Sequence, residues 1–429
     1  MMRRQRPGVS LVYTTALMVV LIGFLSLAVD VGRVQLARME LRTAADGAAF
    51  AGAPYLRPDR ELAVDKALEI LGANKANGEE IPVVADEDVV LGKWRWYSET
   101  FEEAPDSTSR VNAMRVTARR DADRGNPINL FFARILGFNS WDVGAPATVM
   151  LTGGRATLGI VGIDSLSMIG TAETDSYNSS EGAYDPNDHY DNGDIASNGV
   201  ISLTGTVDVN GSLHTGPDGD LDAGSNTTIT GDEFPFPEDL EYPPVDASPY
   251  ASSNYNTLIA DLENVPSNKE PYKPATHDLL VGANIDFALP GIEDPRVPAG
   301  TTVVRYHFHN VTIHGTADIT VGQNVEVYVT GSMDVAGNIG PAPASGSPAD
   351  FKILVDGGGT IKITGQGNQN NYFGAVLYAP EAPITIGGNT DFYGAVIGKS
   401  LDIQGTAGIH YDEALGYEQE WPEETILVE

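Results

Sequence analysis

The sequence contains no cysteine in its 429 residues. This absence excludes disulfides, thiolate metal sites, iron–sulfur clusters and a cysteine nucleophile. Any folded part of the chain is therefore held together by packing and hydrogen bonds alone. Hydrophobic residues make up 42% of the sequence, an ordinary share for a protein that buries a core. The length gives room for about two or three domains.

Basic residues are also scarce. There are 26 Lys and Arg against 59 Asp and Glu, which gives a net charge of −33. Nucleic-acid binding needs clustered Lys and Arg that displace counterions, so we expect no nucleic-acid partner. A strongly acidic surface favours solubility first, and it also suits a protein that collects divalent cations.

Recognisable catalytic motifs are missing as well. No HExxH metalloprotease motif and no GxSxG, P-loop or dinucleotide fingerprint stands in a supporting context. We therefore expect a protein that is not an enzyme, with no catalytic residues and no cofactor.

One long apolar run stands near the N-terminus. Residues 9–29 (VSLVYTTALMVVLIGFLSLAV) carry no charge and are long enough to cross the hydrocarbon core of a membrane. Arg3, Arg4 and Arg6 precede the run, so the positive-inside rule places the N-terminus in the cytoplasm and the rest of the chain outside. The rival is a cleaved signal peptide, but LSLAVDVGR lacks an A-x-A-like cleavage site. The run therefore predicts a retained single-pass anchor.

Small and apolar residues continue at helical spacing beyond the run. They alternate by three and four positions at Val34, Ala37, Leu41, Ala44, Ala48 and Ala51. Such a seam lets another element approach closely. It predicts packing either in a pilus-like or membrane bundle or on the next domain of the same chain.

This N-terminal region resembles TadG-like proteins of the Tad (Flp) pilus-assembly system. The shared features are a basic start with Gly8, the apolar helix, the segment AVDVGR with Asp30, Gly32 and Arg33, and the Ala-rich run AADGAA with Asp46. The resemblance implies that these five residues belong to the membrane anchor and its assembly. It also implies a bacterial cytoplasmic membrane protein whose partners are other pilus-assembly or envelope proteins.

One position departs from the pattern of pilins. Type IV-type pilins carry a Glu five residues after the processing Gly, and this chain has Tyr13 there. The resemblance therefore implies an anchored assembly protein rather than a major pilin subunit.

Residues 55–152 predict a small α+β domain. Asp59 is suited to cap a helix over RELAVDKALEI, and strand-like runs follow at 89–97 and 111–118. The second run alternates, with Met114, Val116 and Ala118 expected inward. Pro127 predicts the start of another helical stretch over INLFFARILGF, in which Phe131 is expected in the core. Residues 141–151 predict a closing strand.

Residues 153–415 predict a mainly β domain because a pentapeptide recurs: apolar, any, apolar, any, Gly. Its copies begin at residues 201, 207, 311, 327, 333, 361, 384 and 401. Each copy predicts a short strand with two residues facing inward, and the Gly allows a turn that a side chain would obstruct. Stacked copies predict an irregular right-handed β-helix or solenoid. A β-sandwich is the alternative.

Two segments of the β domain break this pattern. A Pro-rich insertion occupies about 231–300 and is expected to wrap against the side or end of the domain. Residues 416–429 form an acidic tail, expected to be a strap or loosely ordered. The stretches 167–179, 197–211 and 392–410 resemble β-solenoid-like regions of bacterial envelope proteins.

Calcium is the metal that the acidic residues suggest. Asp218, Asp220 and Asp222 resemble the start of a calcium loop, although the later positions of an EF-hand are not matched. Asp208, Asp334 and Asp402 share the outward middle position of the pentapeptide, and strands in direct register would stack them about 5 Å apart. The alternative is that they point to different sides as solvated charges.

Taken together, the sequence predicts a membrane-anchored envelope protein with residues 1–54 as the anchor. The small domain is expected to act as a spacer or docking module, and the β domain to present a face to envelope proteins or surface glycan. The alternatives are a membrane-anchored β-helix enzyme that acts on carbohydrate, because many β-helices cleave polysaccharides, and a glycan-binding adhesin.

Overall fold

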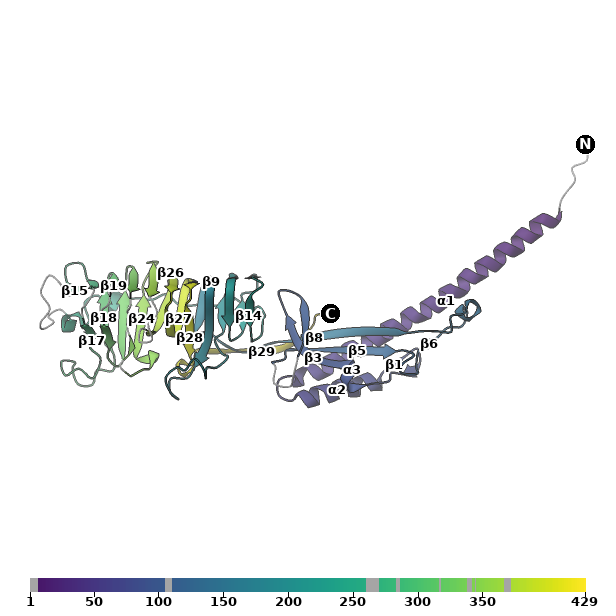
Figure 1. Cartoon of the computed structure of the whole chain (residues 1–429), viewed down its shortest axis with the longest axis horizontal. Helices are drawn as coiled ribbons and strands as arrows, with labels where there is room; N and C mark the ends of the chain where they lie inside the picture. Colours follow the sequence, from purple (N-terminus) through teal and green to yellow (C-terminus); the bar gives the residue numbers. More distant parts are fainter. Residues whose placement is uncertain are drawn as a thin grey trace, which may run out of the picture. The chain divides into compact units, whose positions relative to one another are not determined.

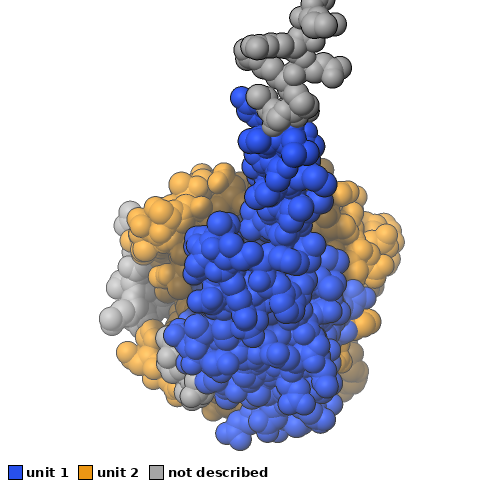
Figure 2. All heavy atoms as spheres, turned by 90° about the vertical axis from the view of Figure 1, so that its right-hand side faces the viewer, with its two compact units in different colours: residues 1–152, 423–429 blue, residues 153–422 orange. Residues whose placement is uncertain are grey.

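The computed structural model describes residues 7–104, 110–259, 270–282, 286–315, 318–337, 342–343, 345–365 and 372–429. The basic residues Arg3, Arg4 and Arg6 lie outside these ranges. The chain forms two compact units: unit 1 is residues 1–152 with 423–429, and unit 2 is residues 153–422 (Figure 2).

A single helix, α1 (Pro7–Gly52), begins unit 1. Among the described residues it is the one helix that is long and apolar enough to cross a membrane. Its most apolar window has a mean hydropathy of 2.3, and none of that window is buried. From Asp30 onward the same helix has a buried face. The part of α1 before Asp30 is therefore apolar and packs on nothing else in the unit over most of its length, whereas the part after Asp30 packs within unit 1 (Figure 1).

In unit 1, α1 and a second helix, α2 (Arg60–Ala73), pack against an antiparallel sheet. The other helices of the unit are η1 (Ala53–Tyr55), α3 (Ala85–Asp88) and η2 (Ala133–Leu136). Its strands are β1 (Lys75–Ala76), β2 (Glu79–Glu80), β3 (Val89–Arg95), β4 (Thr100–Glu103), β5 (Ala113–Arg120), β6 (Ile128–Asn129), β7 (Ser140–Trp141), β8 (Val143–Thr157) and β29 (Glu418–Leu427). The main sheet has the order β29-β8-β5-β3-β4.

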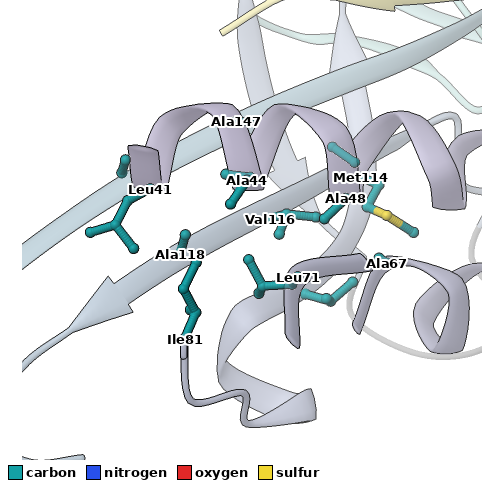
Figure 3. Packing of buried hydrophobic residues seen from close by; sticks show 14 of the residues in the cluster. Leu41, Ala44, Ala48, Ala67, Leu71, Ile81, Met114, Val116, Ala118 and Ala147 are labelled. Carbon is teal, nitrogen blue, oxygen red and sulfur yellow. The ribbon is translucent and has the colours of Figure 1, made fainter. Parts of the chain in front are cut away.

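The seam of small residues on α1 forms the core of this unit. Leu41, Ala44 and Ala48 are fully or almost fully buried and belong to one cluster with Leu71 of α2 and Val116 of β5 (Figure 3). Alanines let α1 lie close to α2 and the sheet, which a seam of larger residues would prevent. Of the two predicted packings of the seam, the structure has the one on the chain's own domain.

The predicted N-cap of α2 is present. The Asp59 carboxylate accepts a hydrogen bond from Leu62 N at 3.0 Å, which satisfies one of the free amides of the first turn. The inward residues predicted for β5, Met114, Val116 and Ala118, are all fully buried.

The helical stretch predicted after Pro127 is wrong. The structure has the short strand β6 there, then only the single 3-10 turn η2, which ends at Gly137 with φ 91°. Phe131, expected in the core, is exposed. The amides that would have begun a helix are instead bound by a carboxylate far away in the sequence.

Unit 2 is built mainly from strands. Those before the insertion are β9 (Ile160–Tyr177), β10 (Ile195–Ser197), β11 (Val200–Val209), β12 (Leu213–Thr215), β13 (Leu221–Ala223) and β14 (Thr227–Ile229). Those within and after it are β15 (Tyr272–Lys273), β16 (Asp278–Val281), β17 (Asp286–Leu289), β18 (Val304–Phe308), β19 (Val311–Gly315), β20 (Asp318–Val321), β21 (Val325–Val329), β22 (Met333–Gly337), β23 (Ala342–Pro343), β24 (Phe351–Val355), β25 (Ile361–Gly365), β26 (Tyr372–Gly388), β27 (Asp391–Gly405) and β28 (Gly408–Asp412). Short 3-10 turns are η3 (Ser248–Tyr250), η4 (Asn256–Ile259), η6 (Pro348–Asp350) and η7 (Glu413–Leu415).

The pentapeptides form a parallel ladder of strands. One row of neighbours runs β16, β19, β22, β25, β26, β27, β9, β11 and β13. The first and third positions of the copies are buried throughout, for example Ile361 and Ile363 in β25 and Leu401 and Ile403 in β27. The predicted alternation of inward and outward residues is therefore confirmed at these strands.

The pentapeptide glycines lie opposite one another in this row. Gly388, Gly405 and Gly205 of the pentapeptides lie in one line, in which Gly170 of β9 stands between Gly405 and Gly205, and all four have φ between 83° and 115°. A side chain on Gly405 would place its Cβ 2.5 Å from the carbonyl oxygen of Gly388. The glycine is required both for the left-handed backbone and for the close approach of the next strand.

The chain enters this ladder in its middle. β9, the first strand of unit 2, pairs with β11 on one side and with the late strand β27 on the other, where Leu166 faces Leu401. The Pro-rich insertion connects the two parts. It contacts Asn198 through Leu240, Tyr378 through Pro243, and β18 through Asn256. The insertion thus contacts the ladder at three separate places.

Candidate functional site

The residue at the end of the apolar run, Asp30, is the centre of the N-terminal site. Its side chain is only 2% exposed. Its carboxylate accepts hydrogen bonds from three consecutive backbone amides, Phe131 N at 2.9 Å, Phe132 N at 2.8 Å and Ala133 N at 2.7 Å. Asp30 therefore fixes η2 to α1.

The electrostatics of Asp30 favour its charged form. Burial by itself would raise the pKa of the carboxyl group, but the three amide donors and the positive charge of Arg33 outweigh it. The pKa of Asp30 therefore lies below its usual value. A charged acceptor also makes each of these hydrogen bonds stronger than a neutral pair.

Arg33 lies one turn further along α1 and contacts the same region. Its guanidinium donates to Asn77 Oδ1 at 3.1 Å and to the carbonyl oxygen of Asn129 at 3.3 Å. Its central carbon lies 4.1 Å from the centre of the Phe131 ring, a cation–π contact. Asp30 and Arg33 together hold the segment from β6 to η2 against the helix.

The other residues predicted for the anchor lie on α1 but not in this cluster. Gly8 is in the first turn of the helix, and Gly32 is exposed with no atom within 4 Å of where a Cβ would stand. Asp46 is partly buried, and its Oδ1 has no hydrogen-bond partner among the described residues. The structure brings together Asp30 and Arg33 but not these three. Sequence reasoning missed the partners of Asp30, because no local signal links it to residues 131–133.

The calcium candidates Asp218, Asp220 and Asp222 are exposed on the turn before β13 and on β13 itself. Across the part of the chain that the structure describes, no group of three or more His, Asp or Glu side chains is placed to hold a metal ion. Calcium binding at these residues stays a prediction.

The three pentapeptide carboxylates do not stack directly. Asp334 faces Lys362 on the next strand, and Asp402 faces Ser167 and Thr385. Asp208 lies in a different row, opposite Glu173. Asp334 and Asp402 share one row but are separated by Lys362 and Thr385 on the strands between them, so the predicted direct stacking is absent.

Unit 2 contains a buried charged cluster that sequence reasoning missed. His410 of β28 is 2% exposed, and its Nδ1 lies 2.6 Å from Asp175 Oδ1. Tyr184 donates to the other oxygen of Asp175 at 2.6 Å, and its ring packs on the imidazole. Asp391 lies 4.0 Å from His410 Nε2. Both oxygens of Asp175 thus have a hydrogen-bond partner.

The pKa of His410 is raised to about 9. Burial by itself would lower this pKa, but the hydrogen bond to Asp175 and the negative charges of Asp175 and Asp391 more than offset it. The imidazole is therefore charged at neutral pH. No motif announces this pair, because Asp175 and His410 are brought together only by the pairing of β9 with β28.

Fold and site together define a class: a protein with one long, bare apolar N-terminal helix, a small α+β unit built on that helix, and a mainly β unit. Matches of parts of the chain to protein-family models describe this class more specifically. Residues 8–54 match the Flp pilus-assembly TadE/G-like family, and residues 46–148 match the Tad-like Flp pilus-assembly family. The predicted resemblance of the N-terminal segment is confirmed by these matches. Residues 300–418 match a domain of unknown function, DUF7305.

No curated protein matches the chain. Among solved structures, the competence-associated pilin ComZ from Thermus thermophilus aligns with 90% of this chain and 98% of its own, at 10% identity and a TM-score of 0.29. At that TM-score the two chains need not share a fold.

Proposed function

We propose that this chain is a structural protein of a Tad/Flp-type pilus-assembly system, held in the bacterial cytoplasmic membrane by residues 9–29. Its N-terminus lies in the cytoplasm, and both units lie in the periplasm or outside the cell. The two pilus-assembly family matches, which cover residues 8–148 between them, support the system. Arg3, Arg4 and Arg6 support the orientation.

The observation that carries the proposal is the change along α1. Before Asp30 the helix exposes large apolar residues such as Leu17, Leu21 and Phe24, while after Asp30 one of its faces is buried in unit 1. Exposing such an apolar helix surface to water is unfavourable, whereas placing it in the hydrocarbon core of a bilayer is favourable. Asp30 itself is satisfied by amides, so the polar end of the run needs no water.

We further propose that unit 2 is a right-handed β-solenoid. The parallel pairing of its pentapeptide strands and their in-register glycines support this interpretation, since a β-sandwich is built from antiparallel strands. A solenoid offers a long face to partners. We expect those partners to be other envelope proteins, with surface glycan as a second candidate.

A non-enzymatic role is part of the proposal. The matched pilus-assembly families are structural ones. Incubating the chain with acidic and neutral glycans, with and without calcium, tests the alternative. Turnover that disappears when a clustered Asp is replaced would overturn the non-enzymatic role, and binding without turnover would indicate an adhesin.

The anchor is tested with charge placed inside the apolar run. Leu17→Arg/Leu21→Arg should move the protein from the membrane to the soluble fraction and abolish surface pili, because each Arg at the centre of a span costs about 2.5–3.5 kcal/mol on insertion scales. The control is Gln35→Arg/Thr43→Arg, at exposed positions of α1 beyond Asp30. If both variants pelleted with membranes alike, the single-anchor proposal would be wrong.

A further inference from the structure

Residues 130–138, within the connection between β6 and β7, expose a group of large apolar side chains; we call this segment the apolar loop. Ile135 is 85% exposed and Leu136 69%. Phe131 and Phe138 are exposed as well, and so is Trp141 at the end of β7. Single exposed apolar residues are common on protein surfaces, but a contiguous patch marks an interaction site.

The apolar loop lies beside the bare half of α1. A mostly apolar groove between them is lined on the helix side by Val19, Val20, Ile22, Gly23, Phe24, Ser26 and Leu27, and on the loop side by Phe132, Ala133, Ile135 and Leu136. Within unit 1, β6 lies at the end where α1 emerges (Figure 1). At a rise of 1.5 Å per residue, Val19 lies about 16 Å along the helix axis from Asp30. The hydrocarbon core is about 30 Å thick, so the groove reaches roughly its midplane if the run spans the bilayer.

The loop is held in this position rather than merely resting there. Asp30 binds the amides of Phe131, Phe132 and Ala133, as described above. Arg33 binds the carbonyl oxygen of Asn129. Moving the loop away from the helix would break these charged hydrogen bonds.

We propose that the apolar loop inserts into the outer half of the lipid bilayer beside α1 and gives the protein a second membrane contact. This inference rests on the anchoring proposed above. Ile135, Leu136 and Phe138 suit the acyl chains, and Trp141 suits the headgroup boundary, where aromatic residues gather. Arg134 is the charged residue of the loop, and its long stem lets the guanidinium reach lipid phosphates.

Lipid fits this surface better than a protein partner does. The loop adds to a surface of α1 that is already apolar on all sides, so the two form one continuous face toward the same surroundings. A protein that covered the loop would also have to cover the neighbouring turns of α1. A protein partner is nevertheless a distinct outcome of the experiment below.

The natural absence of cysteine allows a direct test. Single Cys residues in the full chain, at Ile135→Cys, Val20→Cys and Asp65→Cys, are labelled with the environment-sensitive fluorophore NBD. Ile135 and Val20 are exposed, and Asp65 is an exposed residue of α2, so none of the three substitutions disturbs a core. The chain is reconstituted in phosphatidylethanolamine/phosphatidylglycerol vesicles and quenched by acyl-chain nitroxides or by iodide in the water.

We expect the label at residue 135 to behave like that at residue 20. Both should be quenched by lipid nitroxides about threefold or more above the label at residue 65, which only iodide should quench. Quenching of residue 20 by lipid and of residue 135 by iodide would overturn the inference and leave the anchor intact. Residue 135 shielded from both quenchers would mean that protein covers the loop, which also overturns it. Residue 20 quenched only by iodide would overturn the proposed anchor and the inference together.

Discussion

A charged histidine buried in unit 2 is stable only because carboxylates lie beside it. His410 is buried against Tyr184 and Tyr393, and the pKa near 9 reflects Asp175 at 2.6 Å. An unpaired charge at such a site would be costly, because burial strips it of water. The pair therefore stabilises the junction between β9 and β28 as long as the imidazole keeps its proton.

This pair predicts a pH dependence of stability. A histidine whose pKa is raised in the folded state contributes fully below its unfolded pKa, about 6.5, and the contribution is lost as the pH rises through about 9. We expect the unfolding free energy of unit 2 to fall by up to about 3 kcal/mol between pH 6 and 9.5, at about 1.36 kcal/mol per unit of pKa shift. Urea unfolding of the chain at a series of pH values measures this.

The matched variants for that experiment are His410→Gln and His309→Gln. The first removes the titrating group and should flatten the pH dependence, even if it also lowers stability at every pH. His309 is exposed, so its replacement should leave the slope unchanged. A slope that survives in His410→Gln would contradict the assignment.

At the scale of elements, the joint between α1 and the β6–η2 segment depends on one carboxylate. Asp30→Asn keeps the shape but removes the charge and leaves only one acceptor oxygen for three amides. We expect a loss of about 2–3 kcal/mol in local stability, the typical cost of weakening bonds to a charged group and stranding buried donors. Hydrogen exchange measures it: the amides of Phe131, Phe132 and Ala133 should exchange roughly 30- to 150-fold faster.

The control on the same helix is Asp46→Asn, since Asp46 has no bond to this segment. Its exchange at residues 131–133 should match that of the unaltered chain. Equal protection in all three proteins would show that Asp30 does not hold η2.

The contact between α1 and the β6–η2 segment also shows which features of the elements the sequence does not predict. The anchor run, the capped helix α2 and the inward face of β5 follow from local patterns, namely apolar length, a capping Asp and alternation. The segment INLFFARILGF is predicted to be helical because it follows Pro127, a residue suited to the first turn of a helix. In the structure the segment is instead held by Asp30, about a hundred residues earlier. No window of sequence contains that information.

At the scale of the whole molecule, the pentapeptide predicts the strands but not their order. Each copy defines its inward face and its glycine, and these are local properties. The pairing of Leu166 with Leu401 joins a strand from the beginning of the unit 2 sequence to one near its end. The chain therefore begins this unit in the middle of the ladder. Nothing in either strand identifies its neighbour, because all copies look alike. The long insertion becomes understandable only with this order, as the connection between the two parts of the ladder.

The C-terminal segment shows the same dependence on distant partners. The acidic tail is predicted to be a strap or loosely ordered, and the structure has most of it in β29, the edge strand of the main sheet of unit 1. Its acidic side chains meet arginines of that unit: Glu423 binds Arg57 at 2.6 Å, and Glu429 binds Arg115. Thr148 of β8 exchanges backbone hydrogen bonds with Val428 and Glu429. Backbone pairing with β8 thus orders this acidic segment, and the ion pairs with Arg57 and Arg115 add to it.

Truncation after Pro422 tests whether these last residues complete unit 1. The truncated chain loses the backbone bonds to Thr148 and both ion pairs, and it exposes the edge of β8. We expect unit 1 to be destabilised by about 2–4 kcal/mol, mostly from the backbone bonds, because each partly exposed ion pair contributes at most about 1 kcal/mol. Denaturant unfolding followed by hydrogen exchange at residues 113–120 and 143–151 measures this.

Glu429→Gln, which removes one ion pair and keeps the strand, should cost less than about 1 kcal/mol. Unchanged exchange in the truncated chain would mean that β5 and β8 do not depend on the C-terminal strand, and an equal loss in both variants would assign the effect to charge rather than to the strand.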